Sequence, residues 1–231
     1  MVMRWPWKKK TIHTDAPAFW QDYEALMQQP LPGDTPLAKV PFVVLDTETS
    51  GLDVETSRIL SVGAVRVTNW AIAVTDRLEC HVDTGTIDVT DSAAIHEILP
   101  AQQTDNRSST EVFRQLVAFI GSSVVVGHHI AFDRTMIDKE LKRINGGYPL
   151  QNYFVDTAEL AQRVFAVGPH HIPKPWSLDE LASALHVPKY QRHTAGGDAF
   201  ITALILLKLL ARLEKRGVTT LKHLKRWRIK W

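Results

Sequence analysis

The spacing of apolar and polar residues divides the chain into segments of helical and of extended character. Near the N-terminus, apolar residues recur at helical spacing between Phe19 and Met27, and we expect Asp15 to cap this helix. Several prolines and Gly33 then indicate a linker, and we expect the compact domain to begin near Lys39. Three extended segments follow, at residues 40–48, 58–68 and 74–82.

The pattern in the remainder of the chain alternates between helices and short strands. We expect Asn69 and Trp70 to turn the second extended segment into the third, Thr110 and the capping box at Ser177 to open helices, and Gly217 to end the last helix. The predicted helices cover residues 110–120, 132–144, 157–167 and 197–216, with one more opening at 177, and short strands cover 124–126 and 153–155. Three successive strands followed by alternation predict an α/β fold, a mixed sheet flanked by helices.

The composition, 45% hydrophobic and 23% charged, is that of an ordinary globular protein. Its single cysteine, Cys80, excludes an intramolecular disulfide and a cysteine-based zinc site, and it fits a reducing, cytoplasmic setting. The basic start of the chain is not followed by an apolar run, so we expect no signal peptide. The longest apolar stretch, residues 199–211, contains Thr202 and Lys208 and is too short to span a bilayer, so we expect a buried helix.

Charge is unevenly distributed, although the formal net charge is only +2. Basic residues without neighbouring acids gather at both ends: Arg4, Lys8, Lys9, Lys10, Lys222, Lys225, Arg226, Arg228 and Lys230. The rest of the chain is therefore acidic, and binding a polyanion there would require cations or local basic patches. The basic ends also carry Trp5, Trp7, Trp227 and Trp231. They either grip phosphates and stack bases or are solvated or packed on the domain.

An apolar strand that ends in two acids is the first candidate for chemistry. Asp46 and Glu48 follow the run Phe42–Leu45 and, because side chains alternate along a strand, share one face. Paired carboxylates repel each other unless a cation lies between them, and hard oxygen ligands suit Mg²⁺ or Mn²⁺. Solvated turn residues are the alternative for these acids.

Two further segments place polar side chains where a strand or loop leads into a helix. Asp133 follows the strand at 124–126 and lies in the first turn of the next helix, where a plain helix-start residue is the alternative. His128 and His129 precede it and, as neighbours on an extended segment, should point in opposite directions, which argues against zinc. Asp198 opens the long apolar helix, and His193 lies in the loop before it, with the side chain best suited to accept a proton near neutral pH.

Together these segments resemble the DEDDh (DnaQ-like) exonucleases, the family of the proofreading epsilon subunit of bacterial DNA polymerase III. The resemblance covers roughly residues 40–212 and includes three motifs in order. They are Asp46-x-Glu48 with Thr49, Gly51 and Leu52, then His128-x-x-x-Phe132-Asp133, and then His193-x-Ala195-x-x-Asp198. Ile95-His96 and Asp156-Thr157 resemble further family segments, whereas His129 stands where the family usually has Asn.

The resemblance implies a ribonuclease H-like fold and a two-metal-ion hydrolysis of phosphodiester bonds that starts from the 3′ end. It implies two divalent cations, Mg²⁺ or Mn²⁺, with Asp46, Glu48 and Asp198 as ligands, Asp133 supporting the site through water, and His193 as the base. Nucleoside 5′-monophosphates would be released. The implied substrate contacts are Thr49, Leu52, His96, His128 and Phe132; core packing is the alternative for Phe132.

The sequence leaves the substrate and the partners open. DNA, single-stranded or with frayed ends, is the expected substrate, and RNA is the alternative, because the contact with a 2′-OH cannot be located in one sequence. An inactive nucleic-acid-binding module would lack a ligand or the base, and none of the five is missing. We expect an N-terminal extension and linker at 1–38, the exonuclease domain at 39–217 and a basic tail at 218–231. The extension and the basic tail are candidate surfaces for a polymerase, another protein or an anionic membrane surface, and no membrane span is expected.

Overall fold

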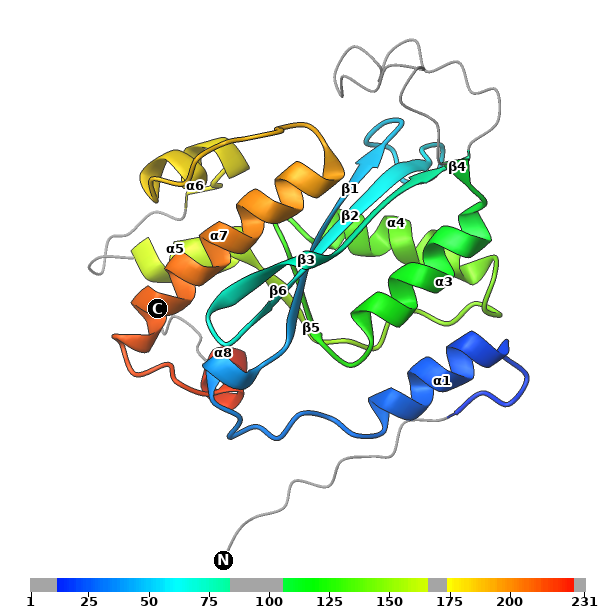
Figure 1. The fold of residues 1–231 in the computed structure, drawn as a ribbon, viewed down its shortest axis with the longest axis horizontal. Helices are drawn as coiled ribbons and strands as arrows, with labels where there is room; N and C mark the ends of the chain where they lie inside the picture. Colours follow the sequence, from blue (N-terminus) through cyan, green and yellow to red (C-terminus); the bar gives the residue numbers. More distant parts are fainter. Residues whose placement is uncertain (1–11, 84–105, 166–173, 227–231) are drawn as a thin grey trace, which may run out of the picture.

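The computed structural model describes residues 12–83, 106–165 and 174–226 of the 231-residue chain (Figure 1). A six-stranded sheet, in the order β4-β3-β2-β1-β5-β6, has helices on both faces. The strands are β1 (Phe42–Thr49), β2 (Ile59–Thr68), β3 (Ala71–Val82), β4 (Asn106–Arg107), β5 (Val124–Gly127) and β6 (Phe154–Asp156). The helices are α1 (Ala18–Met27), α3 (Ser109–Ile120), α4 (Ala131–Lys142), α5 (Thr157–Phe165), α6 (Leu178–Ala184), α7 (Ala195–Glu214) and α8 (Leu221–Arg226), with a 3₁₀ turn at Leu37–Lys39.

The sheet is mixed, as the order of strands and helices in the sequence predicts. β1 pairs antiparallel with β2, β2 pairs antiparallel with β3, and β1, β5 and β6 run parallel to one another. Asn69 and Trp70 both have positive φ, 50° and 59°, which is the conformation of a tight hairpin turn, so the predicted hairpin is confirmed. Asp46 lies directly opposite Gly63 in the β1–β2 register. The buried central strand β1 therefore carries the Asp-x-Glu motif in the middle of the sheet.

Each face of the sheet is covered by its own layer of helices (Figure 1). One hydrophobic cluster joins the sheet to α5, α6, α7 and α8, and a second joins it to α1, α3 and α4. α7 crosses β1 and β2 and buries most of its apolar residues, so the long apolar stretch is a buried helix, as predicted. In the parts of the chain that the structure covers, no helix is both long and apolar enough to cross a membrane.

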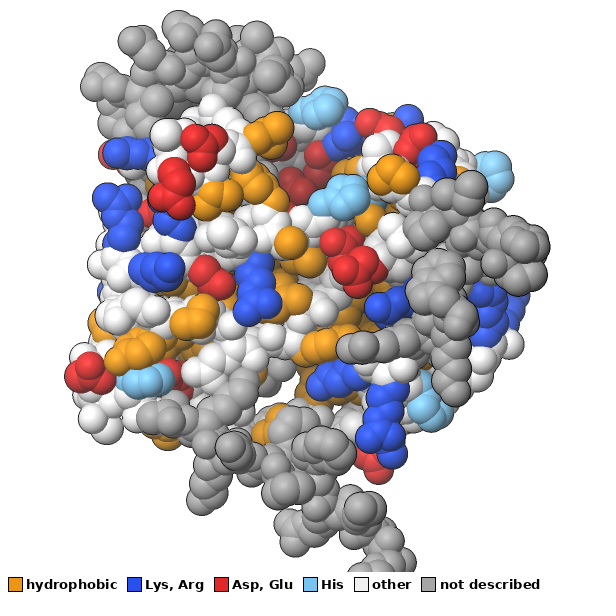
Figure 2. Space-filling model, turned by 180° about the vertical axis from the view of Figure 1, so that it is seen from behind, with side chains coloured by type: hydrophobic (Ala, Val, Ile, Leu, Met, Phe, Trp, Pro, Cys, Tyr) orange, Lys and Arg blue, Asp and Glu red, His pale blue; other side chains and the backbone are white. Residues whose placement is uncertain are grey.

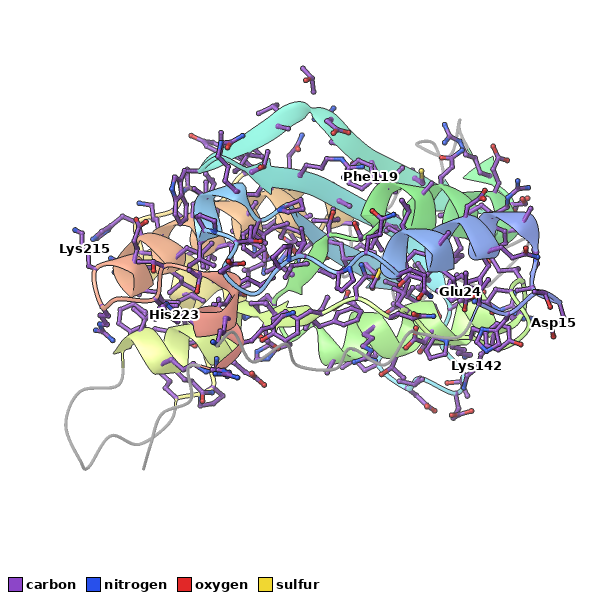
Figure 3. All side chains as sticks on the ribbon, turned by 90° about the horizontal axis from the view of Figure 1, so that it is seen from below. Asp15, Glu24, Phe119, Lys142, Lys215 and His223 are labelled. Atoms are coloured by element: carbon purple, nitrogen blue, oxygen red, sulfur yellow. The ribbon has the colours of Figure 1, made fainter. Side chains whose placement is uncertain are left out.

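The N-terminal segment contributes to the second of these clusters. Trp20 and Tyr23 of α1 are buried, and the Tyr23 hydroxyl donates to Asn152 Oδ1 at 2.6 Å. Glu24 is fully buried and accepts from Trp20 Nε1 at 3.0 Å and from the backbone N–H of His13 at 2.8 Å. In Figure 3, Glu24 lies at the end of the molecule away from Lys215 and His223. Residues 12–38 thus share a core with the rest of the chain, and the proposed division at residue 38 stays a prediction.

The predicted linker and the predicted tail contact each other. The backbone N–H of Leu37 donates to the carbonyl of Thr219 at 2.9 Å, and that of Leu221 donates to the carbonyl of Thr35 at 3.0 Å. Leu221 and Leu224 of α8 are buried. The periodicity of the sequence did not predict α8 or the two-residue strand β4. Basic and aromatic residues at 1–10 and 227–231 are expected to bind phosphates and stack bases. These residues lie outside the described part of the chain.

Two predicted helix caps are wrong and two helix signals are confirmed. α1 begins after Pro17 rather than at a cap formed by Asp15, and α3 is capped by Ser108, whose side chain accepts from Glu111 N, rather than by Thr110. Several residues within two or three positions of a helix start have side chains that can cap the helix. The sequence does not show which of them does. The Ser177 capping box is present, and Gly217 follows α7 with φ of 85°.

Candidate active site

Three carboxylates from two distant segments meet on one face of the sheet. Asp46 and Glu48 project from β1, and Asp198 projects from the first turn of α7; one oxygen from each lies within 4.8 Å of the others. Glu48 and Asp198 are buried, while Asp46 is partly exposed. Figure 2 shows acidic atoms recessed near the upper edge of one face, with histidine side chains beside the recess. Asp46 and Glu48 therefore share one face of the strand, as predicted, and Asp198 is the third acid beside them.

A glycine in β2 allows α7 to approach the sheet closely. A Cβ atom at Gly63 would lie 2.2 Å from the carbonyl carbon of Ala195, the first residue of α7. Real Cβ atoms do not approach other atoms so closely, so any side chain here would push the helix away. Thr194 caps the helix by accepting from Gly197 N at 3.1 Å. The close approach of α7 and the cap at its start together position Asp198 next to β1.

Asp133 lies next to the cluster and is held by β1. Its Oδ1 accepts from the backbone N–H of Thr47 at 3.0 Å and from Thr47 Oγ1 at 2.7 Å. These two bonds join the first turn of α4 to the residue between Asp46 and Glu48. One oxygen of Asp133 is thus committed to Thr47, and the three oxygens grouped within 4.8 Å come from the other acids. Its expected supporting role remains a prediction.

Burial, followed for Asp46 and Glu48 by repulsion between neighbouring acids, makes the charged forms of these acids unfavourable. The pKa of Asp46 is raised well above its usual range by removal from water, followed by repulsion from Asp133, Asp198 and Glu48. The pKa of Glu48 is raised to about 7, first by burial and then by Asp198, with Arg192 opposing the shift. Burial also raises the pKa of Asp133 to about 6, against the bonds from Thr47. A bound cation would relieve this repulsion.

Arg192 brings a positive charge into contact with this cluster. Its Nη1 donates to Oδ2 of Asp198, while Nε and Nη2 donate to the two oxygens of Asp179, each at 3.0 Å. No sequence pattern singled out Arg192, Asp179 or Thr47 as a site residue. Asp179 belongs to the segment of the Ser177 capping box, which gave no sign of a partner 13 residues further on. The sequence feature that could have pointed to Arg192 is its position directly before His193.

The remaining predicted residues differ in their exposure and in the contacts they make. His193 is exposed with φ of 64°, next to Arg192 in the loop that leads into α7. Leu52 is 86% exposed, Thr49 is buried and donates to the carbonyl of Gly51 at 2.8 Å, and Phe132 is half-buried against the α1–α3–α4 cluster. His96 lies outside the described residues. The assignment of these residues to catalysis and substrate binding stays a prediction.

His128 and His129 do not point in opposite directions, so that expectation is wrong. Nε2 of His128 and Nε2 of His129 lie 2.9 and 3.1 Å from the carbonyl oxygen of Trp176, and the two ring centroids are 4.5 Å apart. The cause is a φ of 56° at His129, which takes the chain out of the extended conformation. Burial, followed by the proximity of His129, lowers the pKa of His128 to about 4.

Comparison with protein families and curated proteins identifies relatives over most of the chain. The family described as Exonuclease (RNase_T) matches residues 43–206. A DNA polymerase III subunit epsilon-like protein of Rhodobacter capsulatus is 34% identical over 190 residues, 81% of this chain and 26% of that protein. The DNA polymerase III subunit epsilon of Aquifex aeolicus is 32% identical over 186 residues, 80% of this chain and 88% of that protein. A PolC-type DNA polymerase III of Thermotoga maritima is 26% identical over 85% of this chain and 14% of its own length.

Solved structures of exonuclease I share the fold. Exonuclease I of Methylocaldum szegediense has a TM-score of 0.63 at 18% identity, over 78% of this chain and 42% of that chain. Exonuclease I of E. coli, solved with a dA16 oligonucleotide, has a TM-score of 0.61 at 15% identity, over 77% of this chain and 42% of that chain. The mixed sheet with flanking helices is thus the ribonuclease H-like fold that the motifs implied, which confirms the predicted fold class. The chain spans about a quarter or less of the length of the first curated relatives that it matches.

Proposed function

Because this chain belongs to the exonuclease family that includes the epsilon-like proteins of DNA polymerase III, we propose that it degrades DNA from the 3′ end. Family membership makes the chain a nuclease. Three points are proposed beyond this: degradation starts at the 3′ end, the substrate is single-stranded DNA or a frayed end, and nucleoside 5′-monophosphates are released. The observation that carries it is the meeting of Asp46, Glu48 and Asp198 within 4.8 Å, in the motif order of the family.

The donor set of this cluster fits a divalent cation. Three carboxylates offer hard oxygen ligands, and Oδ1 of Asp198 is buried and accepts no hydrogen bond from the described residues. A buried charged oxygen without a partner is costly, and a cation would supply one. We propose Asp46, Glu48 and Asp198 as ligands of two divalent cations, Mg²⁺ or Mn²⁺, with Asp133 beside them. When bound, these ions would stabilise negative charge on the attacking and leaving oxygens.

The residues of this chain would then carry out the remaining tasks of a hydrolysis. His193, exposed in its loop, accepts the proton of the water that attacks the terminal phosphodiester. The bond between phosphorus and the 3′ oxygen of the preceding nucleotide breaks, which leaves a shortened strand with a 3′-OH. Leu52, whose side chain projects into solvent, and Phe132 are proposed to contact the terminal bases.

Digestion of a single-stranded DNA labelled at its 5′ end, with Mg²⁺ or Mn²⁺, tests the proposal. We expect a ladder that shortens from the 3′ end and disappears with chelator and in Asp46→Asn and His193→Ala. Asp22→Asn and His223→Ala, at exposed positions on α1 and α8, are the matched controls and should digest normally. The absence of any ladder on DNA and on a matched RNA would refute the proposal and favour a binding module. Faster hydrolysis of the RNA would refute the DNA assignment alone.

The N-terminal segment is proposed to dock a polymerase or another protein. Deleting residues 1–38 does not test this, because Trp20 and Tyr23 within that segment are buried in the core. Deletion of residues 1–11 leaves those anchors in place. We expect this shorter deletion to weaken association with a polymerase in sedimentation while hydrolysis of short oligomers persists; unchanged association would contradict docking through these residues.

A further inference from the structure

Arg192 connects the carboxylate cluster to an acid that lies outside it. Its guanidinium forms a bidentate pair with Asp179 of α6, through Nε and Nη2 at 3.0 Å each, and its third nitrogen, Nη1, donates to Oδ2 of Asp198. The Arg192 side chain is 20% exposed and that of Asp198 is 10% exposed. Because a guanidinium is planar and rigid, fixing two of its nitrogens on Asp179 also fixes where the third one points.

This arrangement gives the two oxygens of Asp198 different roles. Oδ2 is held by Arg192, whereas Oδ1 is buried without a hydrogen-bond partner among the described residues. A carboxylate on a helix can rotate about its side-chain bonds, and a bond to one oxygen stops that rotation. Oδ1 is thereby left as the oxygen that can accept a cation next to Asp46 and Glu48.

We propose that Asp179 and Arg192 form a relay that positions Asp198 as a cation ligand. The inference rests on the proposed function, because it assumes that a divalent cation binds at Asp46, Glu48 and Asp198. Arg192 does not itself bind the cation; it acts through Asp198, so it is a positioning residue. Partners of this kind hold ligating side chains in place, and their loss typically weakens metal binding about 10- to 100-fold.

A different role for Arg192 makes the opposite prediction. If its charge merely balanced the acids, Arg192 would compete with the cation, and its removal would tighten metal binding. The bidentate pair with Asp179 favours positioning, since a counter-charge alone needs no such fixed geometry. The same pair also anchors the loop that carries His193, the residue next to Arg192.

Binding of Mn²⁺ to the full chain, measured by electron paramagnetic resonance and calorimetry without nucleic acid, tests the relay. We expect Arg192→Gln to weaken binding about 10- to 100-fold. Arg192→Lys keeps the charge but cannot form the fork, and it should also weaken binding. Asp179→Asn should weaken binding less, because Arg192 is still present. Lys189→Gln is the matched control, because it removes a positive charge from the same loop. Nζ of Lys189 lies 3.5 Å from Oδ1 of Asp179, whereas Arg192 bonds Asp198. This variant should change Mn²⁺ affinity by less than about twofold.

Combining Asp179→Asn with Arg192→Gln adds a readout that a structural role alone would not change. If Asp179 acts through Arg192, the double variant should bind Mn²⁺ no more weakly than Arg192→Gln does. Circular dichroism checks that each variant is folded, and if Arg192→Gln does not fold, Arg192→Lys and Asp179→Asn carry the test. Unchanged or tighter binding in the Arg192 variants, or equal weakening in Lys189→Gln, overturns the relay alone. Absence of Mn²⁺ binding to the wild type, or wild-type affinity in Asp46→Asn, overturns the proposed cation site and the relay with it.

Discussion

Replacing Gly63 by alanine should separate α7 from the sheet and disable the site without destroying the fold. The new Cβ would lie 2.2 Å from the Ala195 carbonyl carbon, whereas ordinary van der Waals contact begins at 3.4 Å. The difference, 3.4 − 2.2 = 1.2 Å, is about the distance by which the start of α7 must move. The obstacle is backbone, which cannot rotate away as a flexible side chain can. Asp198 lies three residues further along the same helix and would move with it.

The expected magnitudes follow from this displacement. Overpacking of a core by one methyl-sized group typically costs about 1–3 kcal/mol, so the variant should remain folded but be less stable. A misplacement of about 1 Å in an active site can cost about 100-fold in rate, and we expect a loss of that order. Gly63 lies opposite Asp46 in the β1–β2 register, so the displacement of α7 occurs at the proposed cation site. Because Asp198 is a proposed ligand and moves with α7, the affinity for Mn²⁺ should fall as well.

Three measurements on Gly63→Ala test this reasoning: urea unfolding, Mn²⁺ binding and the rate of shortening of a 5′-labelled DNA. Gly33→Ala is the matched control, because its Cβ would lie 3.4 Å from the Lys222 Cβ, an ordinary contact. The control should behave like the wild type in all three assays. If Gly63→Ala hydrolyses DNA within a few-fold of the wild-type rate and binds Mn²⁺ as tightly, the close approach of α7 is not needed for the site.

Three further predictions concern stability. Trp20→Ala should lower the free energy of unfolding in urea by about 3–5 kcal/mol, because the side chain is fully buried; a loss below about 1 kcal/mol would show that α1 is dispensable to the core. Thr47→Val removes the 2.7 Å bond to the buried Asp133 carboxylate and should cost about 1–3 kcal/mol in the same assay, whereas an unchanged midpoint would argue against that bond. The pKa of His128 is lowered to about 4 in the folded chain, so between about pH 6.5 and 4 only the unfolded chain takes up this proton, and stability falls as the pH falls. From pH 7 to pH 5, the wild type should lose about 2 kcal/mol more than His128→Gln, and parallel losses would refute the assignment.

Sequence patterns predicted the elements and the chemical groups because both depend on neighbours along the chain. Alternation along β1 was sufficient to place Asp46 and Glu48 on one face, and helix-start chemistry placed Asp198 in the first turn of α7. The order of the motifs implied the fold, which the comparisons confirm. Even among local features, the residue that caps α3 was misassigned to Thr110, because the two candidates differ by only two positions.

Tertiary structure alone decided how these groups are held. The bidentate pair between Asp179 and Arg192 joins α6 to the loop that leads into α7, and it depends on how α6 packs beside the start of α7. The spacing of apolar residues in α1 could not show what covers Trp20; its burial depends on the packing of α1 against α3. The convergence of His128 and His129 follows from one positive φ that the residue types do not reveal. Local rules describe spacing over a few residues, whereas a contact between distant segments is determined only when the whole chain packs.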